Sequence, residues 1–255
     1  MRVLVDYRPA LRNPTGVGEY TRQLVGALAT CRGDRRPDLT IFSSSWKDRL
    51  HVPDELRGVK AVDLRIPVAA LNLAWHRLRW PPVEWLTGQD YDIVHSFHPL
   101  LLPSRSAAQV ITIYDLNFLT HPERTRAEIR RDYPALVRSH AQRADHIIVI
   151  SEFTSREVQR QLGVPVERLS VCRPGAPDWA PRTAAPADGY ALFVGTLEPR
   201  KNVGALLDAY EVLLTRGVAQ LPPLVLAGQS TPEAAAWVAR IARPPLLGHV
   251  RLLGY

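Results

Sequence analysis

The fold class is indicated by the sequence YALFVGTLEPRKN at residues 190–202. Its first residues, Tyr190–Val194, form an apolar run that predicts a short strand. Gly195 follows as a turn, and an apolar pattern of helical period runs over Asn202–Thr215. The alternation continues with a strand, a helix and a strand, at Leu224–Ala227, Pro232–Ala242 and Val250–Leu252. This region therefore predicts a βαβαβ unit, the mononucleotide-binding half of a Rossmann-type fold.

The sequence before this unit shows the same alternation. Short apolar runs predict strands at Arg2–Asp6, Leu39–Ser43, Ala61–Leu64, Ile93–Ser96, Gln109–Ile113 and His146–Ile150. Segments of helical period predict helices at Val17–Thr30, Glu123–Gln142 and Glu152–Gln161. Strands that alternate with helices favour the α/β class, with a parallel sheet that is covered on both sides.

A proline-rich stretch separates the two α/β regions. It contains four prolines, at positions 174, 177, 181 and 186, among several alanines, and this composition is typical of a linker. We therefore expect a Rossmann-like domain over residues 1–173, a linker over 174–189 and a second Rossmann-like domain over 190–255. We expect only about half of the second domain to be present.

The composition excludes several classes of protein. The chain has 255 residues, of which 46% are hydrophobic and 22% charged, as in a globular protein with a core. Its net charge of +7 fits either an arginine-rich surface or attraction to anions. The arginines form no basic stripe with interleaved aromatic residues, so nucleic-acid binding is not indicated. Cys31 and Cys172 have no metal-site or disulfide spacing, and no signal peptide or membrane span is evident. We therefore expect a cytoplasmic location.

Polar residues follow the predicted strands of the first domain. Loops converge at the carboxyl ends of parallel strands, and helix N-termini present free N–H groups there. The residues in these positions are Gly16, Val17, Gly18, His98, Tyr114, Asp115, Ser151 and Glu152. The glycines can cradle an anion or form a plain turn. Ser151 and Glu152 fit either a helix cap or a substrate contact.

The second domain repeats this arrangement. Gly195, Gly228 and Gly254 each follow a predicted strand. Arg200 and Lys201 stand where a helix begins, beside the positive end of its dipole. Two cations at this end are unfavourable unless an anion neutralises them, which favours a diphosphate there. The alternative is a pair of solvated side chains whose charges the helix dipole opposes only mildly.

Other motifs are weaker. Asp90-Tyr91-Asp92 resembles a metal-binding pair of carboxylates, but it precedes a strand and fits a turn. His95 and His98 have ligand-like spacing without further ligands, so no metal or other cofactor is expected. The stretch Ala69–Leu86 combines tryptophans with arginines and is split by a double proline into two short helices. It fits either core packing or contact with a membrane surface.

The ordered set of motifs resembles the family 4 glycosyltransferases, retaining enzymes of GT-B fold. The matching segments begin at Gly16, Val94, Ile111, Ile150 and Gly195, and they extend over GVGEYTR, VHS, ITIYDLNFL, ISEFT and GTLEPRKN. The resemblance implies transfer of a sugar, with mannose and glucose as candidates, from a UDP- or GDP-sugar to a glycan or lipid-linked acceptor. It also implies a role in envelope or exopolysaccharide synthesis, where the inner face of the membrane is a candidate location.

The resemblance also assigns roles to residues. It places Arg200 and Lys201 on the donor diphosphate, as fixed cations in place of a metal ion. Gly16, Val17 and Gly18 would approach the donor phosphate or the acceptor. Tyr114 and Asp115 would lie near the donor sugar as catalytic residues, and Gly195, Gly228 and Gly254 near the nucleoside. His98, Ser151 and Glu152 are candidate acceptor contacts.

Two departures from the family stand out. Tyr114 replaces the histidine of many relatives, and a tyrosine is not a base at neutral pH. The family's pair of glutamates in the second domain has no match, so we expect either a fragment of a longer enzyme or a C-terminally truncated protein.

The alternative function is a non-catalytic remnant that binds acceptor, lipid head group or another subunit. A nicotinamide-dependent oxidoreductase is disfavoured because serines, not an acid, end the second strand.

Overall fold

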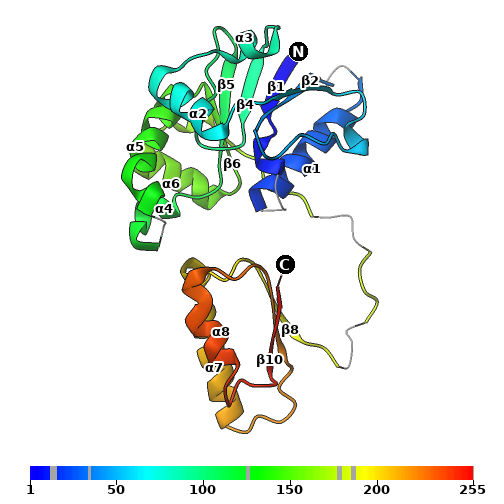
Figure 1. The fold of residues 1–255 in the computed structure, drawn as a ribbon, viewed down its shortest axis with the longest axis vertical. Helices are drawn as coiled ribbons and strands as arrows, with labels where there is room; N and C mark the ends of the chain where they lie inside the picture. The colour runs from blue at the N-terminus through cyan, green and yellow to red at the C-terminus, as the bar shows by residue number, and fades with distance from the viewer. Residues whose placement is uncertain (12–15, 34–35, 125–126, 177–179, 185–187, 255) are drawn as a thin grey trace. The chain divides into compact units, whose positions relative to one another are not determined.

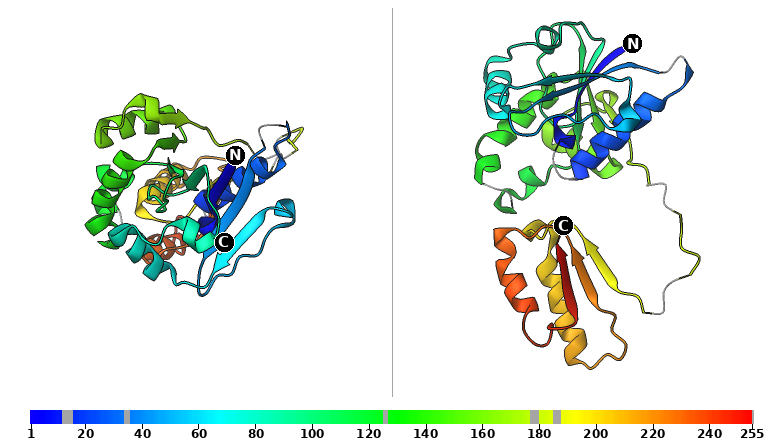
Figure 2. Two further views of the ribbon diagram at one scale, coloured as in Figure 1. Left: turned by 90° about the horizontal axis from the view of Figure 1, so that it is seen from above. Right: turned by 45° about the vertical axis from the view of Figure 1, so that its right-hand side comes forward.

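A computed structural model gives the fold (Figures 1 and 2). It describes residues 1–11, 16–33, 36–124, 127–176, 180–184 and 188–254. The chain divides into two compact units, unit 1 (Met1–Ala176) and unit 2 (Pro177–Tyr255). The division falls within the stretch 174–189 that was predicted as a linker.

Unit 1 is built on a seven-stranded sheet. The strands are β1 (Arg2–Asp6), β2 (Asp38–Ser44), β3 (Lys60–Leu64), β4 (Ile93–Ser96), β5 (Ala108–Ile113), β6 (His146–Val149) and β7 (Leu169–Val171). They are all parallel and lie in the order β3-β2-β1-β4-β5-β6-β7. The strand order reverses between β1 and β4, as in a Rossmann-type sheet, and the predicted α/β class is confirmed.

Helices connect these strands. They are α1 (Gly16–Thr30), α2 (Val68–Leu73), a π-helical turn η4 (Ala74–Leu78), α3 (Val83–Thr87), α4 (Asn117–Thr120), α5 (Ala127–Arg143) and α6 (Glu152–Leu162). The first turn of the helix predicted over Glu123–Gln142 is instead a separate 3-10 turn at Pro122–Arg124. The double proline Pro81-Pro82 separates the α2–η4 helix from α3, as predicted.

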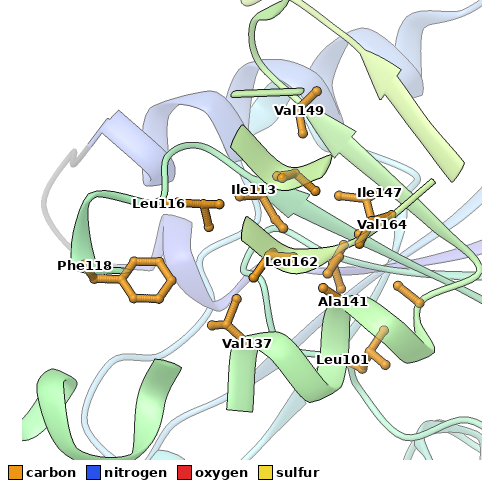
Figure 3. Packing of buried hydrophobic residues seen from close by; sticks show 13 residues of the cluster. Leu101, Ile113, Leu116, Phe118, Val137, Ala141, Ile147, Val149, Leu162 and Val164 are labelled. Carbon is orange, nitrogen blue, oxygen red and sulfur yellow. The ribbon is translucent and has the colours of Figure 1, made fainter. Parts of the chain in front are cut away.

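Because side chains alternate between the two faces of a strand, β1 contributes to two hydrophobic cores. Val3 and Val5 pack with α1 in one cluster, whereas Leu4 packs with Leu71 and Trp75 of the α2–η4 helix in another. A third cluster, drawn in Figure 3, joins the ends of β5 and β6 to α5 and α6, for example through Val137. Burial on both faces fixes the register of each strand, because a shift by one residue would exchange the two faces.

Unit 2 contains a three-stranded parallel sheet in the order β10-β9-β8. Its elements are β8 (Ala191–Val194), a 3-10 turn η7 (Pro199–Lys201), α7 (Val203–Thr215), β9 (Leu224–Ala227), a 3-10 turn η8 (Pro232–Ala234), α8 (Ala235–Ile241) and β10 (Val250–Gly254). In Figure 1 both helices lie on the same side of the sheet. On β8, Phe193 packs into the core, whereas Leu192 and Val194 are exposed. The predicted βαβαβ order is confirmed.

Candidate functional site

A cavity of about 510 Å³ lies at the carboxyl ends of the unit 1 strands. Its lining includes Asp6 at the end of β1 and Ser96 at the end of β4. These are the strands between which the strand order reverses, and such a crevice is where open parallel sheets bind ligands. Further lining residues come from the loop after β2, from α2–η4 and from α5: Ser45, Asp48, Asn72, Trp75, His76 and Tyr133.

An ion pair between Asp6 and Arg8 forms the floor of this site. Arg8 Nε donates to Asp6 Oδ1 at 2.8 Å and Arg8 Nη2 to Asp6 Oδ2 at 2.7 Å. The Asp6 side chain is fully buried and that of Arg8 is 14% exposed. Burial opposes ionisation of Asp6, but the Arg8 guanidinium outweighs it and holds the pKa of Asp6 below its usual range. The two charges therefore neutralise each other inside the protein.

Two further side chains contact the guanidinium of Arg8. Its Nη1 donates to Asn72 Oδ1 at 3.0 Å, and its Cζ lies 4.9 Å from the centroid of the Trp75 ring. The Trp75 ring is buried, and its Nε1 donates to the carbonyl oxygen of Pro81 at 2.9 Å. These contacts fix the α2–η4 helix relative to the end of β1, and they preorganise the polar groups of the cavity.

Two histidines at the cavity, the exposed His98 and the half-buried His76, have lowered pKa values, which favours the neutral imidazole at neutral pH. Desolvation lowers the pKa of His98, although the Asp6 charge opposes this shift. Desolvation, followed by the charge of Arg8, lowers the pKa of His76. His76 Nδ1 is buried and has no hydrogen-bond partner among the described residues. Neutral imidazoles, an aromatic wall and a neutralised ion pair suit a hydroxyl-rich ligand better than an anion.

Tyr114 and Asp115, predicted near the reacting sugar, lie in the loop after β5. Burial raises the pKa of Tyr114, and its hydroxyl group has no hydrogen-bond partner among the described residues. Its ring packs edge-to-face on Tyr20 of α1 at a centroid distance of 5.5 Å. Asp115 is exposed and accepts from the backbone N–H of Asn117 at 3.0 Å. Its charge contributes, after burial, to raising the pKa of Tyr133, which lines the cavity.

Ser151 has the capping role that was one of its two predicted roles. Its Oγ accepts from the backbone N–H of Thr154 at 3.1 Å at the start of α6. Thr154 Oγ1 in turn donates to the carbonyl oxygen of Tyr114 at 3.1 Å, which ties the loop after β5 to this helix. Glu152 is exposed and lies 3.8 Å from the guanidinium of Arg173.

The predicted glycine segment opens α1. Gly16 is exposed, Val17 is half-buried and Gly18 is buried. A Cβ atom at Gly16 would meet no atom within 4 Å, so this position faces open space. Residues 12–15, which precede it, lie outside the described part.

In unit 2 the glycines bring three loops together. Gly228 donates its N–H to the carbonyl oxygen of Gly254 at 2.7 Å, and Gly195 donates to Ala227 at 2.9 Å. A Cβ atom on Gly228 would lie 2.0 Å from the carbonyl oxygen of Gly195. The ends of β8, β9 and β10 are therefore joined by direct backbone contact, which only a glycine at position 228 permits.

Arg200 and Lys201 lie in η7, ahead of α7. Arg200 Nη2 is 2.7 Å from Glu198 Oε1, so Glu198 offsets the charge of Arg200 in this structure, and the diphosphate at this position stays a prediction. Lys201 is exposed, and no carboxylate pairs with it among the described residues. Its Cε is 3.9 Å from the Cβ position of Gly195, which places the side chain at the end of β8.

Residues of the two weak metal-binding motifs make structural contacts. His95 is buried, its Nε2 lies 2.9 Å from Thr112 Oγ1, and burial lowers its pKa to about 4. Asp92 Oδ2 accepts from the backbone N–H of Arg2 at 2.6 Å, at the opposite edge of the sheet from the cavity. Across the described residues, no group of three or more His, Cys, Asp or Glu side chains could hold a metal ion.

Sequence reasoning missed the floor of the cavity. Asp6 ends a predicted strand and Arg8 follows it, so the rule that singled out Tyr114 also applied to them. Their partners Asn72 and Trp75 come from a distant segment, and no local pattern links them to β1.

The chain is similar to known glycosyltransferases. A family model described as Glycosyltransferase Family 4 matches residues 14–178. The chain is 27% identical to O-antigen chain mannosyltransferase B of Escherichia coli, over all of this chain and 71% of that protein. Among the helices that the structure describes, none has the length and apolar character needed to cross a membrane.

Solved structures show the same fold. The glycosyltransferase WaaG, involved in lipopolysaccharide biosynthesis, superposes with a TM-score of 0.66 at 14% identity, over 99% of this chain and 70% of that one. HepE of Anabaena, solved with UDP and glucose, gives a TM-score of 0.55 at 15% identity, over 100% and 69%. The fold is thus the GT-B type, and since the family model covers more than half of the sequence, the chain belongs to Glycosyltransferase Family 4.

Proposed function

We propose that the chain transfers a hexose, mannose or glucose, with retention, from a UDP- or GDP-sugar to a glycan or lipid-linked acceptor during synthesis of an O-antigen-type envelope glycan. The observation that carries the proposal is the preorganised cavity at the strand-order reversal of a family 4 unit. The mannosyltransferase relative supports mannose and an O-antigen-type product. HepE, solved with UDP, supports a nucleotide donor.

The cavity of unit 1 is the proposed acceptor site. The neutral rings of His76 and His98 offer flat surfaces and hydrogen-bonding nitrogens to sugar hydroxyl groups. The Asp6–Arg8 pair and Asn72 hold this wall in place. An acceptor that enters meets groups already oriented, which reduces the entropy cost of binding.

The carboxyl edge of unit 2 is the proposed donor site. No carboxylate of the described residues pairs with Lys201. Arg200 can exchange Glu198 for a phosphate oxygen at small cost, because an exposed ion pair contributes at most about 1 kcal/mol. Fixed cations there offset the charge that develops on the leaving nucleoside diphosphate. The backbone around Gly195, Gly228 and Gly254 is where the nucleoside would lie.

Tyr114 and Asp115 are proposed to act near the donor sugar. The raised pKa of Tyr114 keeps its hydroxyl group protonated at neutral pH, so it does not serve as the base. Asp115 is the exposed carboxylate of this loop, and its Asx-type bond to Asn117 fixes its position. Tyr114 then positions the loop through its packing on Tyr20.

The test is a transfer assay with UDP- and GDP-activated mannose and glucose and a lipid-linked glycan acceptor, with the product read by mass spectrometry and its anomeric configuration by NMR. We expect one donor to be consumed with retention. Arg200→Ala with Lys201→Ala should lower transfer by roughly 100-fold or more, whereas Arg216→Ala, at the far end of α7, should not.

His98→Ala is the matching variant on the acceptor side and should raise the KM for the acceptor without changing donor binding. Acceptor binding without consumption of any donor would contradict transfer and support the non-catalytic alternative. A folded chain that binds none of these sugars would overturn the proposal as a whole.

A further inference from the structure

The segment Val68–Thr87 of unit 1 has two sharply different faces. Its inner face packs into the core through Leu71, Trp75 and Val83, each no more than 2% exposed. Its outer face presents four large apolar side chains to solvent, namely Leu73 (64% exposed), Leu78 (72%), Trp80 (54%) and Trp85 (61%). A run of exposed leucines and tryptophans within one short segment is not explained by core packing.

The outer side chains lie close together. Leu73 and Leu78 lie on the continuous α2–η4 helix, one turn of its π-helical part apart. Trp80 follows this helix, and its ring packs edge-to-face on Trp85 of α3 at a centroid distance of 6.2 Å. The two tryptophans therefore join the end of the helix to α3, which lies at the sheet edge where β1 begins (Figure 1).

The exposed charges within the segment have one sign. Residues 65–89 include Arg65, Arg77 and Arg79, all exposed, and a single carboxylate, Glu84. Glu84 points inward, is 4% exposed and accepts hydrogen bonds from the Ser104 hydroxyl and the Arg105 backbone. The exposed charge of the segment is therefore entirely positive.

Arg79 interacts electrostatically with a further cation. Burial and then the charge of Arg79 lower the pKa of Arg143, at the end of α5. Arg79 also contributes to lowering the pKa of the buried His140. Repulsion between cations at this place is relieved when an anionic surface approaches.

We propose that Leu73, Leu78, Trp80 and Trp85, flanked by Arg77 and Arg79, form a docking surface for an anionic phospholipid bilayer. Tryptophans favour the boundary between head groups and acyl chains, where the ring is apolar and the indole N–H stays hydrated. Arginines beside them are attracted by anionic head groups. A protein groove would match the apolar side chains, but it would not require this one-signed charge.

The experiment is co-sedimentation of the full chain with vesicles of phosphatidylcholine, with and without phosphatidylglycerol. Binding should require phosphatidylglycerol and should weaken as salt is added to the unmodified protein. Trp80→Ser with Trp85→Ser should lower partitioning by roughly tenfold or more, and Arg77→Gln with Arg79→Asn should lower it by a similar factor. Asparagine is chosen at 79 because it tolerates the left-handed backbone there (φ 54°).

Trp46→Ser is the control, because Trp46 is 70% exposed but follows β2 at the other edge of the sheet. Thermal unfolding of all variants verifies that they fold. The proposal is overturned if the unmodified protein ignores phosphatidylglycerol vesicles, if salt has no effect, or if the Trp46 variant loses as much binding as the Trp80 and Trp85 variant. A protein partner in place of the bilayer would give the first of these results.

Discussion

Each unit places an arginine–carboxylate pair at the carboxyl edge of its sheet, and the two pairs have the same length but different surroundings. Arg8–Asp6 in unit 1 and Arg200–Glu198 in unit 2 are both 2.7 Å apart. The side chains of the first are 14% and 0% exposed, and those of the second are 38% and 32% exposed. A buried pair cannot lose one partner without leaving an unpaired charge in the interior, whereas an exposed pair can exchange a partner for a ligand.

Because the two ion pairs differ in exposure, we expect them to have different roles. The Arg8–Asp6 pair is part of the framework, since Asn72 and Trp75 also hold the guanidinium. The Arg200–Glu198 pair lies in a short 3-10 turn and is available to solvent. We therefore expect changes at Arg8 to affect folding and changes at Arg200 to affect binding.

The largest effect is expected for Arg8→Ala. This change leaves the Asp6 carboxylate buried without its guanidinium, which costs about 3–5 kcal/mol for a buried pair. Urea unfolding followed by tryptophan fluorescence should show this loss, and Asp6→Asn with Arg8→Ala should recover part of it. If Arg8→Ala left the free energy of unfolding unchanged, the framework role of the pair would be refuted.

A similar loss is expected in unit 2 for Gly228→Ala, because backbone contact and not a buried ion pair holds that edge. The new Cβ would clash with the carbonyl oxygen of Gly195, at a cost of about 3 kcal/mol. Gly248→Ala is the matched control, since its Cβ would meet no atom within 4 Å and only its φ of 82° is unfavourable, at about 1 kcal/mol. Equal melting temperatures for the two variants would count against this account.

A moderate effect of pH is expected in unit 1. Burial lowers the pKa of both His95 and His140 to about 4, from about 6.5 in the unfolded chain. Between these values the unfolded state binds more protons, so the free energy of unfolding should fall as the pH drops from about 6.5 to about 4, by about 1–3 kcal/mol per histidine. His95→Gln and His140→Asn, which retain an acceptor, should flatten this dependence. An unchanged slope in both variants would show that other groups cause it.

The smallest effect on stability is expected for Arg200→Ala. The exposed pair with Glu198 contributes about 1 kcal/mol or less. Thermal unfolding should therefore barely change, in contrast to Arg8→Ala. A large loss of stability would place Arg200 in the framework and remove the distinction between the two pairs.

The sequence predicted the elements of the fold better than the contacts of the site. The strands β1, β4 and β9 have the predicted bounds, since each is an apolar run with clear ends. Strand β7 was missed because it has three residues, all half-buried, and directly follows a 3-10 turn. Three residues are too few to show a periodic pattern of hydrophobic side chains.

At the site, contacts between residues close in sequence could be predicted, whereas contacts between residues far apart in sequence could not. Ser151 sits one residue ahead of its helix, so its capping role was visible. Glu198 is two residues from Arg200, and that pair could have been predicted. Asn72 is 64 residues from Arg8, and only the path of the chain after β3 brings them together. The floor of the cavity is therefore a property of the fold.

The most direct test of this account is isothermal titration of UDP and GDP into the unmodified chain and into Arg200→Ala with Lys201→Ala. The account predicts that one of the two nucleotides binds the unmodified chain, that the double variant loses this binding, and that the thermal unfolding of the double variant stays nearly the same. Equal affinity in both proteins would contradict the assignment of the diphosphate to the exposed cations of unit 2.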